Sequence, residues 1–479
     1  MILERFGDDD LSQVSYLVGC PAAGDAIVID PRRDIQVYLD RADALGVRIT
    51  AVTETHIHAD YLSGTRELAA ATGARIFLPG EGGTDWAYGY DATLLHSGDD
   101  IQIGSLTIEA VHTPGHTPEH LMFLVADGSR TTDVDGVGEV GYAFTGDFVF
   151  VGDLGRPDLL DEVAGGTDSR YEGARQLFDS LREHFLPLED YVQVLPAHGA
   201  GSACGKAMSA VPTTTVGYER EFSWWVPYVR MGDLEGFTDQ LLNGQPDAHA
   251  YFSRMKRQNR QGPAILGERP GLAEFSGGAA QAALADGSHV LIDTRSLEDI
   301  AEGVADGSLT IPAPRRLASF GAWAVDPETD SAGIILLAAS EEKAQRMADH
   351  LVRVGIDRVV GFIRCLDGIE LHAPASVGPE ELDGFGHDML LDVRQKAEFA
   401  RGTIPGAQQL SAGRVLWDRC ELPQGRIVVF CQSGVRSAVA ASVLRRAGLD
   451  VVELTGGFAR YCEATAERRA EKPQLTSAP

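Results

Sequence analysis

The stretch Ile49-Thr-Ala-Val-Thr-Glu-Thr-His56-Ile-His58-Ala-Asp60-Tyr61 joins a strand-like segment to a cluster of metal-binding side chains. Its beginning has the β-branched, apolar composition of a buried strand. Further along the chain, His116, Asp147 and His198 lie in short segments rich in glycine or proline. Imidazole and carboxylate groups at the ends of strands suit a mid-row divalent metal ion. The sequence therefore predicts a metal site on an α/β scaffold.

The regions on either side of this stretch predict the organisation of the chain. Residues 1–245 alternate strand-like runs with helical stretches, as one α/β domain would. Residues 246–270 hold a basic cluster and the pair Gly262-Pro263, so we predict a solvated linker without a binding role. The segment 466–479 is charged and contains proline, and we expect a frayed tail.

An internal repeat follows the predicted linker. The segment Val290-Leu-Ile-Asp293-Thr-Arg295 matches Leu390-Leu-Asp392-Val-Arg394, and further matching segments follow both in the same order. Each copy alternates strand-like and helical segments. We therefore predict two sibling α/β domains, over residues 271–375 and 376–465.

The second copy carries a thiol at the turn between a strand and a helix. The segment Cys431-Gln-Ser-Gly-Val-Arg436-Ser follows the apolar run Ile427–Phe430 and precedes a helical segment. At such a turn, backbone N–H groups and the helix N-terminus stabilise a thiolate and cradle an anion. We predict Cys431 as a nucleophile at the start of an anion-binding loop, which continues through Gln432, Ser433, Gly434, Val435, Arg436 and Ser437.

The first copy lacks this thiol. In the register of the repeat, Ala338 stands opposite Cys431 and Lys343 opposite Arg436. Because a methyl group cannot act as a nucleophile, we predict that residues 271–375 form an inactive domain, a spacer or a docking platform.

Composition limits the classes of partner. Lysine and arginine total 41 and aspartate and glutamate total 70, so the net charge is −29. This charge argues against nucleic acid or an anionic membrane surface as the main partner. No apolar run approaches the roughly 20 residues of a membrane-spanning helix, and the first residues do not resemble a signal peptide. Six cysteines are too few and too irregular for a disulfide framework. We expect a cytoplasmic homo-oligomer.

The metal-type motif, together with the later histidine turns, resembles the metallo-β-lactamase superfamily over residues 1–245. This resemblance implies an αββα sandwich, and with the repeats it gives an α/β multidomain protein. The family's full motif ends in a histidine that supports a second metal, whereas this chain has Tyr61. With that departure, the segment is most similar to the persulfide dioxygenases, which hold one iron with two histidines and one aspartate.

The resemblance implies one Fe(II) per chain, held by His56, His116 and Asp147. Two histidines and one carboxylate leave positions on the ion open, which suits oxygen chemistry, whereas zinc is redox-inert. Other side chains are then expected around the metal or beside the substrate: His58, Asp60, Tyr61, His198, Arg156 and Cys204.

Two of these side chains have alternative interpretations. Arg156 can bind a carboxylate or phosphate of the substrate, or it can pair with Asp153 or Asp158. Cys204 lies in a glycine-rich loop shortly after His198, where it can hand on sulfur or fill a buried space.

The Cys431 loop has the Cys-x-x-Gly-x-Arg pattern of rhodaneses, and Asp392, Arg394 and Glu398 also match that family. Cysteine phosphatases carry five residues between the cysteine and the arginine, whereas this loop has four, which suits a persulfide sulfur. Residues 376–465 therefore resemble an active rhodanese. This resemblance implies Cys431 and Arg436 as catalytic residues, with a sulfur-binding loop of Gln432, Ser433, Gly434, Val435 and Ser437. The order of the domains resembles the persulfide dioxygenase–rhodanese fusions of bacterial sulfide detoxification.

This resemblance implies a function. A low-molecular-weight thiol persulfide, of the glutathione or coenzyme A type, is oxidised with O₂ to sulfite. Cys431 carries a sulfane sulfur that joins sulfite as thiosulfate, or moves in the opposite direction.

Two alternatives stay open. The first is a zinc thioester hydrolase of the glyoxalase II type fused to a sulfurtransferase. Tyr61 counts against it, because that chemistry relies on two metals and a bridging hydroxide. The second is a non-catalytic persulfide sensor or carrier that uses Cys431 and Cys204, against which the intact metal set argues.

Overall fold

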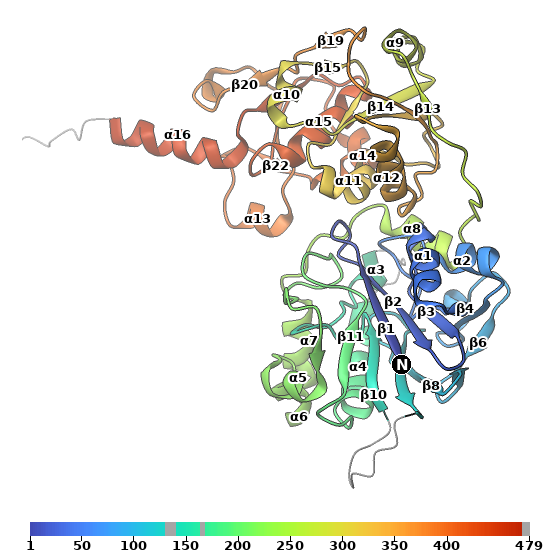
Figure 1. Cartoon of the computed structure of the whole chain (residues 1–479). Coiled ribbons are helices and arrows are strands. Elements are labelled where there is room, and N and C mark those ends of the chain that lie inside the picture. The colour runs from blue at the N-terminus through green and yellow to red at the C-terminus, as the bar shows by residue number, and fades with distance from the viewer. Residues whose placement is uncertain (130–139, 163–167, 472–479) are drawn as a thin grey trace, which may run out of the picture. The chain divides into compact units, whose positions relative to one another are not determined.

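The computed structural model describes residues 1–129, 140–162 and 168–471, and the chain forms two compact units (Figure 1). The N-terminal unit comprises Met1–Ala248, Phe252–Arg269 and Val352–Gly355, and the C-terminal unit comprises His249–Tyr251, Pro270–Leu351 and the chain from Ile356 onward. Among the helices in these described ranges, none is long and apolar enough to cross a membrane.

The N-terminal unit is built on two six-stranded sheets. The first has the order β1 (Ile2–Gly7), β2 (Val14–Cys20), β3 (Asp25–Ile29), β4 (Arg48–Thr53), β5 (Arg75–Pro79), β6 (Thr93–Leu95). The second has the order β12 (Thr214–Thr215), β11 (Gln193–Pro196), β10 (Val140–Gly146), β9 (Leu121–Asp127), β8 (Leu106–His112), β7 (Asp100–Ile103). Strands β3 to β6 run parallel, and so do β10 and β11.

Helices cover the outer faces of both sheets. Helices α1 (Gln36–Leu45) and α2 (Thr65–Thr72) pack on the first sheet, and α4 (Ser169–Ser180), α5 (Val216–Phe222), α6 (Val226–Met231) and α7 (Leu234–Leu242) pack on the second. The unit also contains α3 (Leu159–Glu162) and α8 (Phe252–Gln261). Strand β2 shows how the layers arise. Tyr16 and Val18 point into the core between the sheets, while Leu17 points to the core under α1 and α2.

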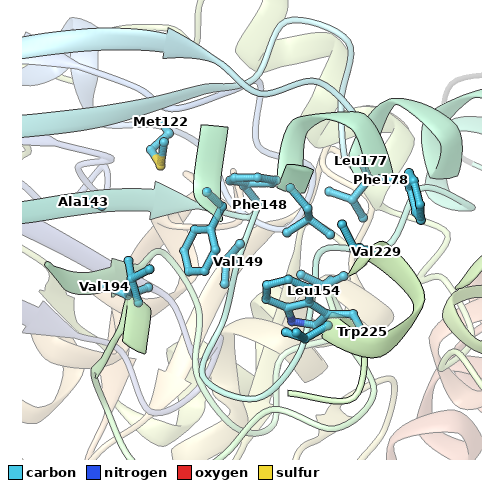
Figure 2. Packing of buried hydrophobic residues seen from close by; sticks show 14 of the residues in the cluster. Met122, Ala143, Phe148, Val149, Leu154, Leu177, Phe178, Val194, Trp225 and Val229 are labelled. Atoms are coloured by element: carbon cyan, nitrogen blue, oxygen red, sulfur yellow. The ribbon is translucent and has the colours of Figure 1, made fainter. Parts of the chain in front are cut away.

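A third core lies on the outer face of the second sheet. Met122 and Val194 of its strands pack in one cluster with Leu177 of α4 and Trp225, which precedes α6 (Figure 2). Three apolar layers thus alternate with two sheets, and the predicted αββα sandwich is confirmed.

The C-terminal unit contains the predicted repeat as two five-stranded parallel sheets with one strand order. The first is β13 (Ala273–Glu274), β18 (Val359–Ile363), β17 (Gly333–Leu337), β14 (His289–Asp293), β16 (Leu309–Thr310). The second is β20 (Ser376–Val377), β24 (Val451–Leu454), β23 (Ile427–Phe430), β21 (Met389–Asp392), β22 (Gln408–Gln409). A short pair, β15 (Val304–Ala305) and β19 (Leu371–His372), accompanies the first sheet.

Three helices of the C-terminal unit correspond between the copies. Helices α10 (Leu297–Glu302), α11 (Leu317–Ala324) and α12 (Glu341–Val352) of the first copy match α13 (Lys396–Ala400), α14 (Val415–Asp418) and α15 (Val435–Arg446) of the second. Helix α9 (Gly277–Ala285) opens the first copy and α16 (Gly457–Glu471) closes the second, and neither has a matching α-helix in the described part of the other copy. Helix α15 buries eight consecutive residues, and Thr310 of the first copy donates a hydrogen bond to its Ala438 carbonyl at 3.0 Å. Helix α15 of the second copy is therefore hydrogen-bonded to the first copy, while each copy keeps its own hydrophobic cluster.

Two segments differ from the sequence expectation. The predicted linker 246–270 contains helix α8, which belongs to the N-terminal unit and buries Phe252, Met255 and Asn259 on one stripe. The predicted tail begins inside α16, and residues 472–479 lie outside the described residues.

Candidate metal centre and sulfur-transfer loop

The predicted metal ligands come from loops that follow strands of both sheets. His56, His58 and Asp60 follow β4, and His116 follows β8. Asp147 directly follows β10 and His198 follows the parallel neighbour β11. Parallel strands bring the residues at their carboxyl ends to one edge of a sheet, which is why residues far apart in sequence meet here.

His56, His116 and Asp147 form the inner group. All three are buried, and one ligand atom from each lies within 4.8 Å of the others. The Asp147 Oδ2 atom is 3.9 Å from His56 Nε2 and 3.5 Å from His116 Nε2. This oxygen is buried and accepts no hydrogen bond from any described residue. A buried carboxylate oxygen without a partner is costly, so the group fits a metal ion.

Hydrogen bonds hold the outer nitrogen of each imidazole. His56 Nδ1 lies 3.0 Å from Thr55 Oγ1, and His116 Nδ1 lies 3.0 Å from the carbonyl oxygen of Arg156. Each ring therefore presents Nε2 to the centre, as ligand histidines with a hydrogen-bonded second nitrogen do.

The charge states suit metal binding. Burial, and then the neighbouring His58, lower the pKa of His56 well below its usual range, and burial lowers that of His116. Burial by itself raises the pKa of Asp147, but His198 and the other histidines outweigh it and hold that pKa well below its usual range. Two neutral imidazoles and one carboxylate result, which is the donor set of a two-histidine, one-carboxylate site.

His58 and Tyr61 are fixed by the end of strand β3. His58 Nε2 lies 3.0 Å from Asp30 Oδ1, whereas the buried Nδ1 has no hydrogen-bond partner in the described part of the chain. The Tyr61 hydroxyl donates to the Asp30 carbonyl at 3.1 Å and accepts from Gln13 at 3.3 Å. The Tyr61 hydroxyl is thus bonded to the scaffold through Asp30 and Gln13.

Asp60, His198 and Cys204 form an adjacent buried group, also with ligand atoms within 4.8 Å of one another. His198 lies between two carboxylates, 2.8 Å from Asp60 Oδ2 and 2.6 Å from Asp147 Oδ1. Burial, and then the charges of Asp147 and Asp60, raise the pKa of the Cys204 thiol well above its usual range. Cys204 is therefore a protonated thiol beside the centre in this arrangement.

The surroundings of Arg156 differ from those expected of a residue that binds the substrate. Its side chain is 1% exposed, and it forms a two-pronged ion pair with Asp158. Its Nη1 atom donates to the carbonyl oxygens of Ala203 at 3.1 Å and Pro246 at 2.6 Å. With its donors used in this way, Arg156 holds the loop of Cys204 and does not present a free guanidinium to a substrate.

Gly155, which precedes Arg156, lies very close to the backbone of Asp147. A Cβ atom at Gly155 would lie 1.8 Å from the Asp147 carbonyl oxygen, so only glycine fits there without a shift of the backbone.

Sequence reasoning missed Asp30, which accepts from the Thr55 amide at 2.7 Å in addition to binding His58. The signal was present, because Asp30 ends a strand-like run next to the metal-bearing strand. Glu119 was also missed. It accepts from the Ile57 amide at 2.7 Å, and burial raises its pKa to about 7.

The predicted sulfur-transfer loop connects β23 to α15. The Cys431 Sγ atom is buried and accepts from the Gly434 amide at 3.2 Å and from the Ser437 hydroxyl at 3.5 Å. Gly434 has a φ of 107°, which favours glycine at this turn. Arg436 donates to both carboxylate oxygens of Glu398, at 2.6 and 2.8 Å.

Gln432, Ser433 and Val435 also lie in the segment that joins β23 to α15, with Gln432 and Ser433 exposed. The Gln432 Oε1 atom accepts from Arg394 at 3.3 Å. A buried sulfur that faces N–H and O–H donors at a helix start can hold a thiolate or a persulfide.

Comparison with known proteins agrees with this geometry. The model of the metallo-beta-lactamase superfamily matches residues 8–198, and the model of the rhodanese-like domain matches residues 379–464. A crystal structure of a metallo-beta-lactamase from Staphylococcus aureus is 34% identical with a TM-score of 0.66, over 76% of this chain and 99% of that chain.

Two curated relatives match the N-terminal unit. A hydroxyacylglutathione hydrolase of Rhodospirillum rubrum is 34% identical over 178 residues, which is 37% of this chain and 59% of that protein. The mitochondrial persulfide dioxygenase ETHE1 of Mus musculus is 30% identical over 205 residues, 41% of this chain and 68% of that protein. The chain belongs to the metallo-beta-lactamase superfamily, and a rhodanese-like domain follows its metallo-beta-lactamase fold.

Proposed function

We propose that the chain is a non-haem iron(II) persulfide dioxygenase fused to a sulfurtransferase. The observation that carries the proposal is the donor set, two neutral histidines and Asp147 with an Oδ2 atom that has no partner in the described chain, next to a Tyr61 whose hydroxyl is bonded to the Asp30 carbonyl. The occurrence of this group in one chain with the Cys431 loop supports sulfur as the shared substrate element. The relationship to the mouse persulfide dioxygenase supports the same reaction.

His56, His116 and Asp147 would hold the ion. An iron(II) ion in such a site supplies open positions and the one-electron chemistry that reaction with O₂ requires. The net reaction converts one thiol persulfide, one O₂ and one water into one thiol, one sulfite and two protons. The sulfur–sulfur bond breaks, and the outer sulfur is oxidised while O₂ is reduced.

The protein's own groups orient the centre. Thr55 and the Arg156 carbonyl fix the ligand imidazoles, and Asp147 Oδ1 is held by His198 at 2.6 Å. The three ligand side chains are buried, so the ion would lie beneath the protein surface. The thiol part of the persulfide, of the glutathione or coenzyme A type, stays outside this buried group.

In the C-terminal unit, the Cys431 thiolate would take the outer sulfur from a donor and become a persulfide. The Gly434 amide and the Ser437 hydroxyl stabilise the charge on Sγ. Attack of sulfite on the outer sulfur then gives thiosulfate and restores the thiolate. The same residues serve the reverse direction.

A second candidate is a zinc thioester hydrolase. The unpartnered Nδ1 atom of buried His58 favours it, because a third imidazole would complete a redox-inert zinc site. The hydroxyacylglutathione hydrolase of Rhodospirillum rubrum is a relative of this kind.

One experiment separates the two. The full chain is stripped of metal and reloaded anaerobically with Fe(II) or with Zn(II), and O₂ uptake is recorded on addition of glutathione persulfide and, separately, coenzyme A persulfide. Uptake with iron only, with one sulfite formed per O₂, is expected. No uptake with iron, together with hydrolysis of lactoylglutathione by the zinc sample, would establish the hydrolase instead.

A further inference from the structure

Asn259 lies on helix α8, yet its side chain is bonded to the loop that carries the metal-site residues. It is fully buried. Its Nδ2 atom donates to the carbonyl oxygens of His58 and Tyr61, both at 2.7 Å. Its Oδ1 atom accepts from the Ser63 amide at 2.9 Å. One side chain therefore satisfies three backbone groups of the loop.

This loop needs such support because residues 54–62 form neither helix nor strand. Buried backbone carbonyl and amide groups outside regular structure require other partners. Other side chains fix parts of it: Glu119 accepts from the Ile57 amide, and Glu54 accepts from the Ser63 hydroxyl at 2.5 Å. Asn259 bonds both the His58 and the Tyr61 carbonyl, one before and one after Asp60 in the loop.

The chemistry of the side chain is specific. A carboxamide offers two donors and an acceptor, whereas a carboxylate of the same shape offers acceptors only. An aspartate at position 259 would place negative oxygens against two carbonyl oxygens and leave both without a donor.

Helix α8 is anchored independently of Asn259. Arg260 donates to the carbonyl oxygens of Thr84 at 2.8 Å and Ala87 at 3.1 Å. The Lys256 ammonium lies 3.6 Å from the centre of the Trp86 ring. A change at Asn259 should therefore leave α8 in place and act on the loop.

We propose that Asn259 is a positioning residue of the metal centre, which fixes the His58–Ser63 loop and through it the orientation of His58 and Asp60 beside the ligands. The inference rests on the metal centre of the proposed function, but not on the identity of the ion. A segment that sequence composition marks as a linker would then contribute to the metal site.

The test uses full-length Asn259→Asp and Asn259→Ser with Co(II) as the probe, because Co(II) reports on the site whether the natural ion is iron or zinc. Co(II) affinity is measured by competition with a chelator, and the visible absorption spectrum reports the ligand geometry. The control is Asn243→Asp, which makes the same chemical change at an exposed residue after α7. The far-ultraviolet circular dichroism spectrum and the thermal unfolding curve show whether each variant is folded, and sulfur transfer at Cys431 shows that the C-terminal unit is unchanged.

We expect Co(II) affinity about 10- to 100-fold weaker in both Asn259 variants, the usual effect of losing an outer hydrogen bond. Their spectra should change, while the control and sulfur transfer stay within about twofold of wild type. If the added charge of Asn259→Asp prevents folding, the Co(II) affinity and spectrum of Asn259→Ser test the proposal. Unchanged affinity and spectrum in either folded variant would overturn the inference and leave the proposed function standing. Failure of wild type to take up Co(II) would overturn both.

Discussion

The two repeats of the C-terminal unit form the same aspartate–arginine ion pair, but they differ in the loop that carries Cys431 in the second repeat. In the first, Arg295 bonds Asp293 and the Gly303 carbonyl, each at 2.7 Å. In the second, Arg394 bonds Asp392 and the Gly402 carbonyl at the same distances. Both repeats thus keep the ion pair that closes the turn between strand and helix, whether or not the repeat carries the thiol.

The difference lies at the start of one helix in each repeat. Helix α15 has no acidic residue in its first turn, and the Gly434 amide that precedes it points to the Cys431 sulfur. Helix α12 begins with Glu341 and Glu342, whose carboxylates occupy the positive end of the helix dipole. An anion site therefore depends on an unoccupied helix N-terminus as well as on the thiol.

The largest effect is expected from Cys431→Ser. Because a hydroxyl at this position is a poor nucleophile and cannot form a persulfide, sulfur transfer from thiosulfate to cyanide should fall by at least about 1,000-fold. O₂ uptake with glutathione persulfide should stay near the wild-type rate. The rate of thiocyanate formation measures the first, and an oxygen electrode the second.

The matched control is Cys365→Ser, which removes an exposed thiol from the first repeat. It should leave both activities unchanged. Sulfur transfer that survives in Cys431→Ser but is lost in Cys365→Ser would show that the nucleophile lies in the first repeat, and would contradict the prediction.

Arg436→Lys should have the next largest effect. Lysine keeps the charge but cannot bond both oxygens of Glu398, as the guanidinium does. Loss of one charge-assisted hydrogen bond of about 1.5 kcal/mol predicts an approximately tenfold lower kcat/KM for thiosulfate. The reciprocal change in the first repeat, Lys343→Arg, should change nothing. Equal kcat/KM for Arg436→Lys and wild type would show that the paired hydrogen bonds from Arg436 to Glu398 do not contribute to sulfur transfer.

Several features of both units could be predicted from sequence because they are local. His56, His116 and Asp147 each stand in a short motif after a strand, and the structure brings them together. The repeat was predictable from the Asp–Arg pairs, since each pair closes within its own turn. The iron and its role stay predictions.

Other features depend on contacts between distant segments. Asn259 is 201 residues from His58 in the sequence, and its burial follows only from the docking of α8. The sequence shows that Arg156 is positively charged, but it does not show that its N–H groups bond Asp158 and two backbone carbonyls. Helix α8 itself had a readable signal, the apolar stripe with Phe252 and Met255, which its basic residues obscured.

A smaller effect is expected from Glu398→Gln on stability. The hydrogen bond and charge of Arg436 lower the pKa of Glu398 below its usual range, despite the opposing effect of burial. A lowered folded-state pKa stabilises the native state above the unfolded value of about 4.3, and the gain is lost as pH falls through the folded pKa. Because the pair is partly exposed, the difference should be below about 1 kcal/mol.

Urea unfolding of wild type and Glu398→Gln over the acid range measures this difference. The two unfolding free energies should differ at pH 7 and converge as the pH is lowered. A difference that grows on acidification would mean that the ion pair does not stabilise the folded repeat.

The smallest effect is expected from giving the first repeat its missing thiol. Ala338→Cys, made in the Cys431→Ser background, places a sulfur at the end of β17 in a buried position. Glu341 stands where the second repeat has Gly434, so this helix start carries a carboxylate and lacks the left-handed backbone of the glycine. Sulfur transfer should therefore stay below about 1% of wild type, because a thiol without an open anion site is neither activated nor able to bind thiosulfate. Substantial recovery by the thiol alone would break the comparison, since the two helix starts would then be equivalent. Recovery only after addition of Glu341→Gly and Lys343→Arg would locate the difference between the repeats in the loop that follows the strand.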